Sequence, residues 1–140
     1  MTQNCQTEGP WRAPAAARTA AWDLLADVIP DLKTLADEYR VSIDVLDEEV
    51  YGVFRGHLRQ SLAGLAAALA GCDERAAREY AHSFEGTGGT MGFPEISAAG
   101  VALSRAAQAG EWQVCRVIHE RLEQWLRVAE AAVQTAEGTP

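Results

Sequence analysis

The sequence predicts an all-α fold, an antiparallel up-and-down four-helix bundle with an additional N-terminal helical segment. Apolar residues recur at intervals of three and four along most of the chain, which is the spacing of amphipathic helices. No segment shows the strict alternation of apolar and polar residues that is typical of a half-buried strand. The breaks between the last four predicted helices are short, at 71–72, 91–93 and 110, so neighbouring helices must run antiparallel.

The segment before the bundle divides into a leader and a helical extension. Residues 1–14 mix polar residues with glycine and proline, and we expect them to form a flexible leader. A helical pattern follows over residues 15–40, but Pro30 interrupts it. Because proline removes a helical hydrogen bond, we expect a kink or two short helices over 15–29 and 31–40. We expect this N-terminal extension to cover one end of the bundle or to contact a partner.

The bundle itself is predicted over residues 42–136, with a short tail over 137–140. Its first helix is expected at about 44–70, where Ser42 is suited to cap the start and Gly71 to end the helix. Its apolar stripe consists of Leu46, Val50, Phe54, Leu58, Leu62, Leu65 and Leu69.

Three more helices complete the predicted bundle. Asp73 is suited to cap the second helix, which runs to about Gly88 or Thr90. Pro94 is suited to the first position of the third helix, because an N–H group there would have no partner within the helix. The third and fourth helices are expected at about 94–109 and 111–136.

Composition and charge exclude several classes of partner. The 140-residue chain has a formal net charge of -8 and an isoelectric point near 4.8, which argues against nucleic acid and against an anionic membrane surface. No apolar run approaches the roughly 20 residues that span a membrane, and the first residues lack the order of a secretory signal. We therefore expect a cytoplasmic location. The three cysteines are too widely spaced for a disulfide framework or a tight zinc site.

One histidine, His82, lies in a helical context and is followed by glycines at one-turn spacing. At about 100° per residue, several residues fall within about 60° of its direction and share its helix face. These are Arg75, Arg78, Glu79, Glu85, Gly86 and Gly89. The opposite face, which we expect to be buried, carries Ala77, Tyr80, Phe84, Gly88 and Met91. The imidazole should therefore face solvent, beside two glycines that leave the backbone bare for a close approach.

The other histidines and three of the tryptophans are expected to be structural. His57 and His119 each border an apolar stripe and should lie at the edge of the core rather than act as ligands. Trp22, Trp112 and Trp125 are expected to pack in the core or at a bundle end. The chain contains no GxxxxGK, GxSxG or HExxH motif, so nothing in it indicates an enzyme.

The residues around His82 resemble the signature of histidine-containing phosphotransfer (HPt) domains, the four-helix modules of bacterial and fungal phosphorelays. That signature is roughly Ala-His-x-hydrophobic-Lys-Gly, followed by small residues and then by a hydrophobic residue and glycine. The matching residues are Ala81, His82, Phe84, Gly86, Met91 and Gly92. The inter-helix turns that follow Leu65 and Leu103 are also similar to those of the family, and the resemblance covers about residues 44–136.

The resemblance implies that His82 accepts a phosphoryl group from the aspartate of a response-regulator receiver domain, or from a sensor histidine kinase, and passes it to another receiver. A neutral imidazole is nucleophilic near neutral pH, so such a carrier needs no catalytic machinery of its own. The resemblance also implies that magnesium belongs to the partner receiver and that this chain needs no cofactor. Arg75, Arg78, Glu85, Gly86 and Gly89 would surround the phosphoryl group and the docked partner.

Glu85 departs from the signature, which usually has lysine at this position. A carboxylate about 7 Å from a phosphoryl group in a water-like dielectric would repel it by roughly 1 kcal/mol, and Arg78 would offset a similar amount. Glu85 is equally explained as a solvated carboxylate paired with Arg78 or Arg75. Two alternatives to a phosphoryl carrier therefore stay open: a transfer-impaired HPt-like module that docks receivers and regulates by occupancy, and an unrelated helical adaptor that dimerises through residues 15–40.

Overall fold

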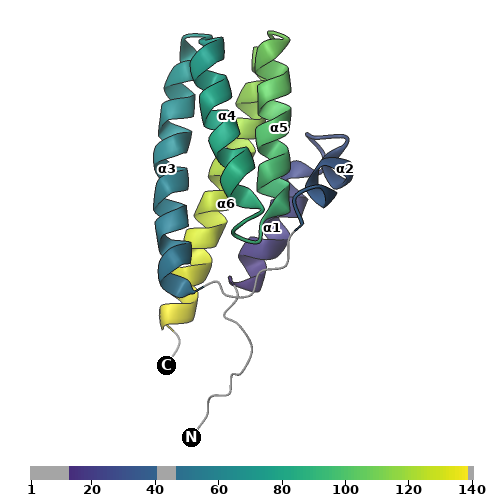
Figure 1. The fold of residues 1–140 in the computed structure, drawn as a ribbon. Helices are drawn as coiled ribbons and strands as arrows, with labels where there is room; N and C mark the ends of the chain where they lie inside the picture. The colour runs from purple at the N-terminus through teal and green to yellow at the C-terminus, as the bar shows by residue number, and fades with distance from the viewer. Residues whose placement is uncertain (1–12, 41–46, 139–140) are drawn as a thin grey trace, which may run out of the picture.

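The computed structural model describes residues 13–40 and 47–138, with side chains described up to Val133 (Figure 1). Every regular element within these residues is an α-helix, which confirms the predicted all-α fold. The helices are α1 Ala15–Leu25, α2 Leu32–Asp37, α3 Glu48–Ala70, α4 Glu74–Gly88, α5 Pro94–Gln108 and α6 Trp112–Gly138.

The helices α3 to α6 form a bundle in which each helix contacts two others. α3 packs against α4 and α6, and α5 packs against the same two helices. Short turns at 71–73, 89–93 and 109–111 join consecutive helices, which therefore run in alternating directions (Figure 1). The contact between α4 and α5 is the most extensive between any two helices in the described part of the chain.

Aspartates cap the first two helices of the bundle. Asp47 and Asp73 each accept a hydrogen bond from the backbone N–H three residues further on, at 2.7 and 3.1 Å. The prediction for Asp73 is confirmed. The predicted cap Ser42 lies outside the described residues. Because Asp47 is extended and α3 begins at Glu48, the predicted start of this helix at residue 44 is wrong.

An aromatic cluster fills the core at the end of the bundle where α3 begins. Phe93 lies at its centre, with its ring centroid 5.0 Å from that of Trp125, 6.0 Å from that of Phe54 and 6.1 Å from that of Tyr51. Trp125 is fully buried, and its indole Nε1 donates a hydrogen bond to the Ala17 carbonyl at 2.8 Å. The cluster therefore also anchors α1 to the bundle.

The N-terminal extension lies along the side of the bundle. α1 packs mainly on α6, and α2 packs on α5 (Figure 1). The buried face of α1 is formed by Ala17, Ala21 and Leu25, so Trp22 falls beside this face and is 40% exposed. The extension therefore does not cover a bundle end, and its contact with a partner stays a prediction. Of the two positions expected for Trp22, the core is wrong.

The break within the extension begins before Pro30. α1 ends at Leu25, whose carbonyl still accepts hydrogen bonds from the N–H groups of the turn that follows. α2 begins only at Leu32 and is short. The observed helices are therefore shorter than the predicted ranges 15–29 and 31–40.

The two residues before α1 are packed. Ala13 is buried, and its carbonyl accepts a hydrogen bond from Nε of Arg18 at 2.9 Å. Pro14 occupies the N-cap position of α1. The predicted flexible leader over 1–14 is therefore wrong for these two residues, and its remaining part, 1–12, lies outside the described residues.

Gly100 allows the backbones of α4 and α5 to approach each other directly. A Cβ atom at Gly100 would lie 2.5 Å from the Ala81 carbonyl oxygen and 2.6 Å from the Glu85 backbone nitrogen. Only glycine fits this contact without a shift of one helix. The segment of α4 between Ala81 and Glu85 is therefore held against α5 on its buried side.

The Gly100→Ala variant tests this contact. The added methyl group meets backbone atoms that cannot move aside, so we expect the free energy of unfolding in urea to fall by roughly 1–3 kcal/mol. Gly56→Ala in α3 is the matched control, since a Cβ atom there meets nothing within 4 Å. The control should gain about 0.5–1 kcal/mol from the better helix propensity of alanine. Equal stability of the two variants would contradict the close contact.

Candidate functional site

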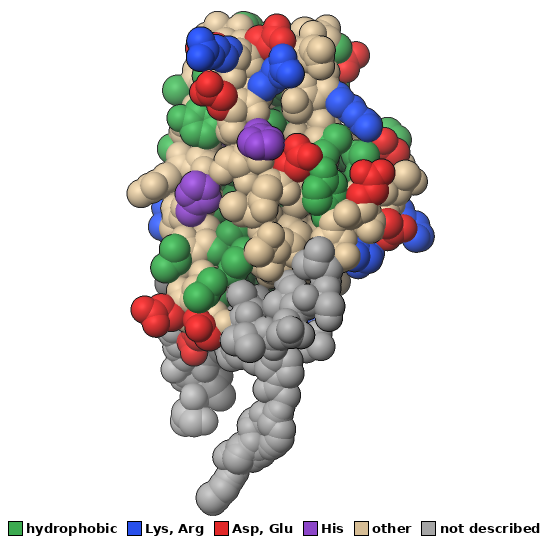
Figure 2. Space-filling view, in the orientation of Figure 1, with side chains coloured by type: hydrophobic (Ala, Val, Ile, Leu, Met, Phe, Trp, Pro, Cys, Tyr) green, Lys and Arg blue, Asp and Glu red, His purple; other side chains and the backbone are tan. Residues whose placement is uncertain are grey.

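His82 projects into solvent from the middle of α4. Its side chain is 85% exposed, whereas the neighbouring Ala81 and Phe84 are buried. Figure 2 shows histidine side chains on one face of the molecule, with acidic, basic and hydrophobic side chains around them. The predicted direction of the imidazole is confirmed. Tyr80 and Met91, which we assigned to the buried face, are only half-buried because they lie at its edges.

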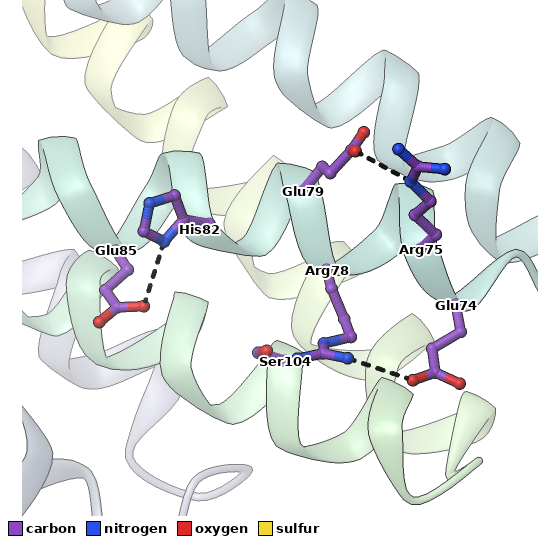
Figure 3. Close-up of a pocket in the computed structure, with 7 residues that line it drawn as sticks. All are labelled: Glu74, Arg75, Arg78, Glu79, His82, Glu85 and Ser104. Carbon is purple, nitrogen blue, oxygen red and sulfur yellow. Dashed lines mark hydrogen bonds and ion pairs between the residues drawn. The ribbon is translucent and has the colours of Figure 1, made fainter.

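Glu85 lies one turn beyond His82 and connects it to the N-terminal extension. Its Oε1 atom is 3.9 Å from Nδ1 of His82 (Figure 3), and its Oε2 atom accepts a hydrogen bond from the Tyr39 hydroxyl at 2.5 Å. This hydrogen bond, together with burial and the nearby charges of Glu85 and Glu38, raises the pKa of Tyr39 to about 12. The phenol therefore stays protonated and remains a donor to Glu85 well above neutral pH.

Arg75 and Arg78 lie on the same face, in the turns of α4 that precede His82 (Figure 3). Arg75 pairs with Glu79 at 3.5 Å, and Arg78 pairs with Glu74 at 3.4 Å. Both pairs are exposed, and such surface pairs contribute little to stability, so both guanidinium groups can exchange their partners. The suggested pairing of Glu85 with either arginine is wrong, because Tyr39 and His82 are the partners that Glu85 faces.

The two glycines after His82 differ in their surroundings. Gly86 is exposed, and a Cβ atom there would meet nothing within 4 Å. Gly89 is buried, and a Cβ atom there would lie 2.5 Å from the Tyr39 carbonyl oxygen. The expected bare backbone is therefore present at Gly86, whereas at Gly89 the chain's own extension makes the close approach. The periodicity of α4 carries no information about where the extension packs. The sequence therefore did not indicate that Tyr39 covers Gly89.

A shallow apolar depression between α3 and α4 adjoins the site. It is lined by Val50, Val53, Phe54, His57, Gly86, Thr87, Thr90 and Met91. Val53 is 69% exposed and Val50 45% exposed, so the assignment of Val50 to the buried stripe is wrong. Val50, Val53 and His57 are spaced three and four residues apart, so they share one exposed face of α3. This spacing was the sequence signal for the depression.

In each of the other two histidines, Nε2 lies within hydrogen-bond distance of another residue of the bundle. Nε2 of His119 lies 2.9 Å from the Leu62 carbonyl oxygen, and this histidine is buried rather than at the edge of the core as predicted. His57 is exposed, and its Nε2 is 3.0 Å from Oγ of Ser83. Among the described residues, no three His, Cys, Asp or Glu side chains are arranged to hold a metal ion.

The family model of the Hpt domain matches residues 49–132 of the chain. This range runs from the first turn of α3 into α6 and leaves α1 and α2 outside. Searches of curated proteins and of solved structures returned no match. Among the described helices, none combines the length and the apolar character needed to cross a membrane.

The matched range contains the whole helical face that carries His82. Hpt domains are phosphoryl carriers of two-component phosphorelays and interact there with receiver domains and kinases. Since the match covers more than half of the sequence, this chain belongs to the Hpt domain family.

Proposed function

We propose that His82 is the phosphoryl-accepting residue of this Hpt domain. It would take the group from the aspartyl phosphate of a receiver domain, or from a histidine kinase, and pass it to another receiver. The observation that supports this proposal is the 85% exposed imidazole in the middle of a helix that is packed on its other side. Among the described contacts, Nε2 of His82 has no hydrogen bond, whereas Nε2 of His57 and of His119 each have one.

The transfer needs only a nucleophile and correct positioning from this chain. The lone pair on Nε2 attacks the phosphorus atom, an N–P bond forms, and the P–O bond to the donor aspartate breaks with its electron pair left on the carboxylate. The return step reverses these changes toward the aspartate of a second receiver. The receiver would hold the magnesium ion that offsets the phosphoryl charge, so we propose no cofactor for this chain. Positioning then supplies most of the rate.

Charge and shape around His82 support a docked receiver in this proposal. Arg75 and Arg78 lie in exposed pairs that can open, so they are available to the phosphoryl group or to the acidic site of a receiver. Gly86 leaves room beside the ring for a loop of the partner. The apolar depression around Val53 offers the hydrophobic contact area that a protein interface needs at its centre.

A labelling experiment tests the role of His82. Receiver domains from the same organism, charged with radiolabelled acetyl phosphate, should transfer acid-labile and alkali-stable label to this chain. The His82→Gln variant should take no label, because the nucleophilic nitrogen is gone. His119→Gln, which lies on α6 outside the apolar depression and can still donate to the Leu62 carbonyl, should be labelled like the wild type. Full labelling of His82→Gln would refute the assignment.

A pair of valine variants tests the docking surface. Val53→Glu places a charge in the apolar depression and should weaken the apparent affinity for a charged receiver about tenfold, which corresponds to roughly 1.4 kcal/mol. Val114→Glu on α6 is the matched control, since Val114 is also exposed and lies outside the depression. Transfer rates measured over a range of receiver concentrations give both affinities. The same affinity in both variants would place the receiver elsewhere.

A further inference from the structure

Tyr39, just beyond α2, reaches the site from outside the part of the chain that matches the family. α2 is held on α5 by its buried residues, whereas the exposed ion pair between Asp31 and Arg105 at 3.0 Å contributes little. The backbone of Tyr39 packs on Gly89, and its hydroxyl donates to Oε2 of Glu85. The position of this hydroxyl is therefore set by the packing of the extension.

The two carboxylate oxygens of Glu85 face different residues. Oε2 is engaged by Tyr39 at 2.5 Å, so Oε1 is the oxygen that faces Nδ1 of His82, at 3.9 Å (Figure 3). A glutamate on a helix surface has several accessible rotamers. With one oxygen tied to the extension, the rotamer that keeps Oε1 beside the imidazole is favoured.

We propose that Tyr39 is a positioning residue for phosphoryl transfer: it holds Glu85 so that the carboxylate keeps the ring proton of His82 on Nδ1 and leaves the lone pair of Nε2 pointing outward. This inference rests on the proposed role of His82. A small rotation of the exposed ring would bring Nδ1 within the roughly 2.7–3.2 Å of a hydrogen bond.

The change in charge on the His82 ring during transfer explains why a carboxylate beside Nδ1 would favour the reaction. When Nε2 forms the N–P bond, the ring keeps its proton on Nδ1 and becomes positively charged. The carboxylate of Glu85 stabilises this charge without taking the proton. In the return step the N–P bond breaks, its electron pair returns to Nε2, and the ring is neutral again. A phosphoryl group on Nε2 would lie on the far side of the ring from Glu85, which faces Nδ1, so a carboxylate would be tolerated where the family usually has lysine.

The titration of Tyr39 tests whether the hydrogen bond is present. Difference absorbance spectra between wild type and Tyr39→Phe should show a phenol with a pKa of about 12, whereas Glu85→Gln should move it down toward the ordinary value near 10. Because the pKa is higher in the folded chain, this contact stabilises the fold fully below about pH 10, and its contribution disappears as the pH rises through about 12. An ordinary value in the wild type would exclude the contact.

The tautomer of His82 is the direct test of positioning. Long-range proton–nitrogen NMR of the unphosphorylated chain should show the neutral His82 ring mainly with its proton on Nδ1. Tyr39→Phe and Glu85→Gln should both shift the population toward the form protonated on Nε2. Asp31→Asn is the control, because it removes another contact of α2 without touching Tyr39. An unchanged tautomer ratio in Tyr39→Phe, or an equal shift in Asp31→Asn, would overturn the inference.

Transfer kinetics complete the test. Tyr39→Phe should slow labelling from a charged receiver about threefold to tenfold, the effect of losing one hydrogen bond, and the double variant with Glu85→Gln should lose no more than Glu85→Gln alone. Additive losses in the double variant would contradict a shared role. If the wild type took no label, the proposed function would fail, whereas the tautomer ratios would still decide the role of Tyr39.

Discussion

The backbone contact between α4 and α5 fixes the position of the site. Gly100 lets α5 approach the backbone of α4 behind His82, and Ser97 binds the same stretch by donating to the Glu85 carbonyl and accepting from the Gly89 N–H, both at 2.7 Å. The backbone of α4 around His82 is therefore held in place by Gly100 and Ser97 of α5. The imidazole of His82 takes no part in these contacts. An exposed imidazole on such a rigid segment keeps a fixed position relative to a docked partner. Phosphoryl transfer depends on this fixed geometry.

The N-terminal extension adds a second support that the family match does not include. Trp125 ties α1 to the aromatic core through the Ala17 carbonyl, and α2 carries the chain on to Tyr39 beside Glu85. The packing of the extension on the bundle therefore sets the position of the Glu85 carboxylate beside His82. A carboxylate would be unfavourable beside a phosphorylated ring if it were free to turn toward the phosphoryl group. Held by a tyrosine on the other side, it faces Nδ1 instead.

The features that depend on local periodicity were predictable from the sequence, and those that depend on long-range packing were not. The spacing of apolar residues was enough to predict the four bundle helices and the outward direction of His82, because both follow from one helix at a time. Gly89 and Glu85 acquired different partners from those expected, since these come from Tyr39 on a separate element. The short α2 carries too few residues for its pattern to reveal which helix it contacts. The exposed position of Val50 was missed because two apolar stripes overlap on α3.

Phosphorus and nitrogen NMR of the phosphorylated chain, which identifies the ring nitrogen bonded to phosphorus, tests most directly whether the outward imidazole on α4 carries the phosphoryl group. The geometry of Glu85 and the open surface beside Gly86 predict a single N–P bond at Nε2 of His82. A bond at Nδ1 of His82 would contradict the orientation of the ring by Glu85. A bond to another histidine would contradict the site itself.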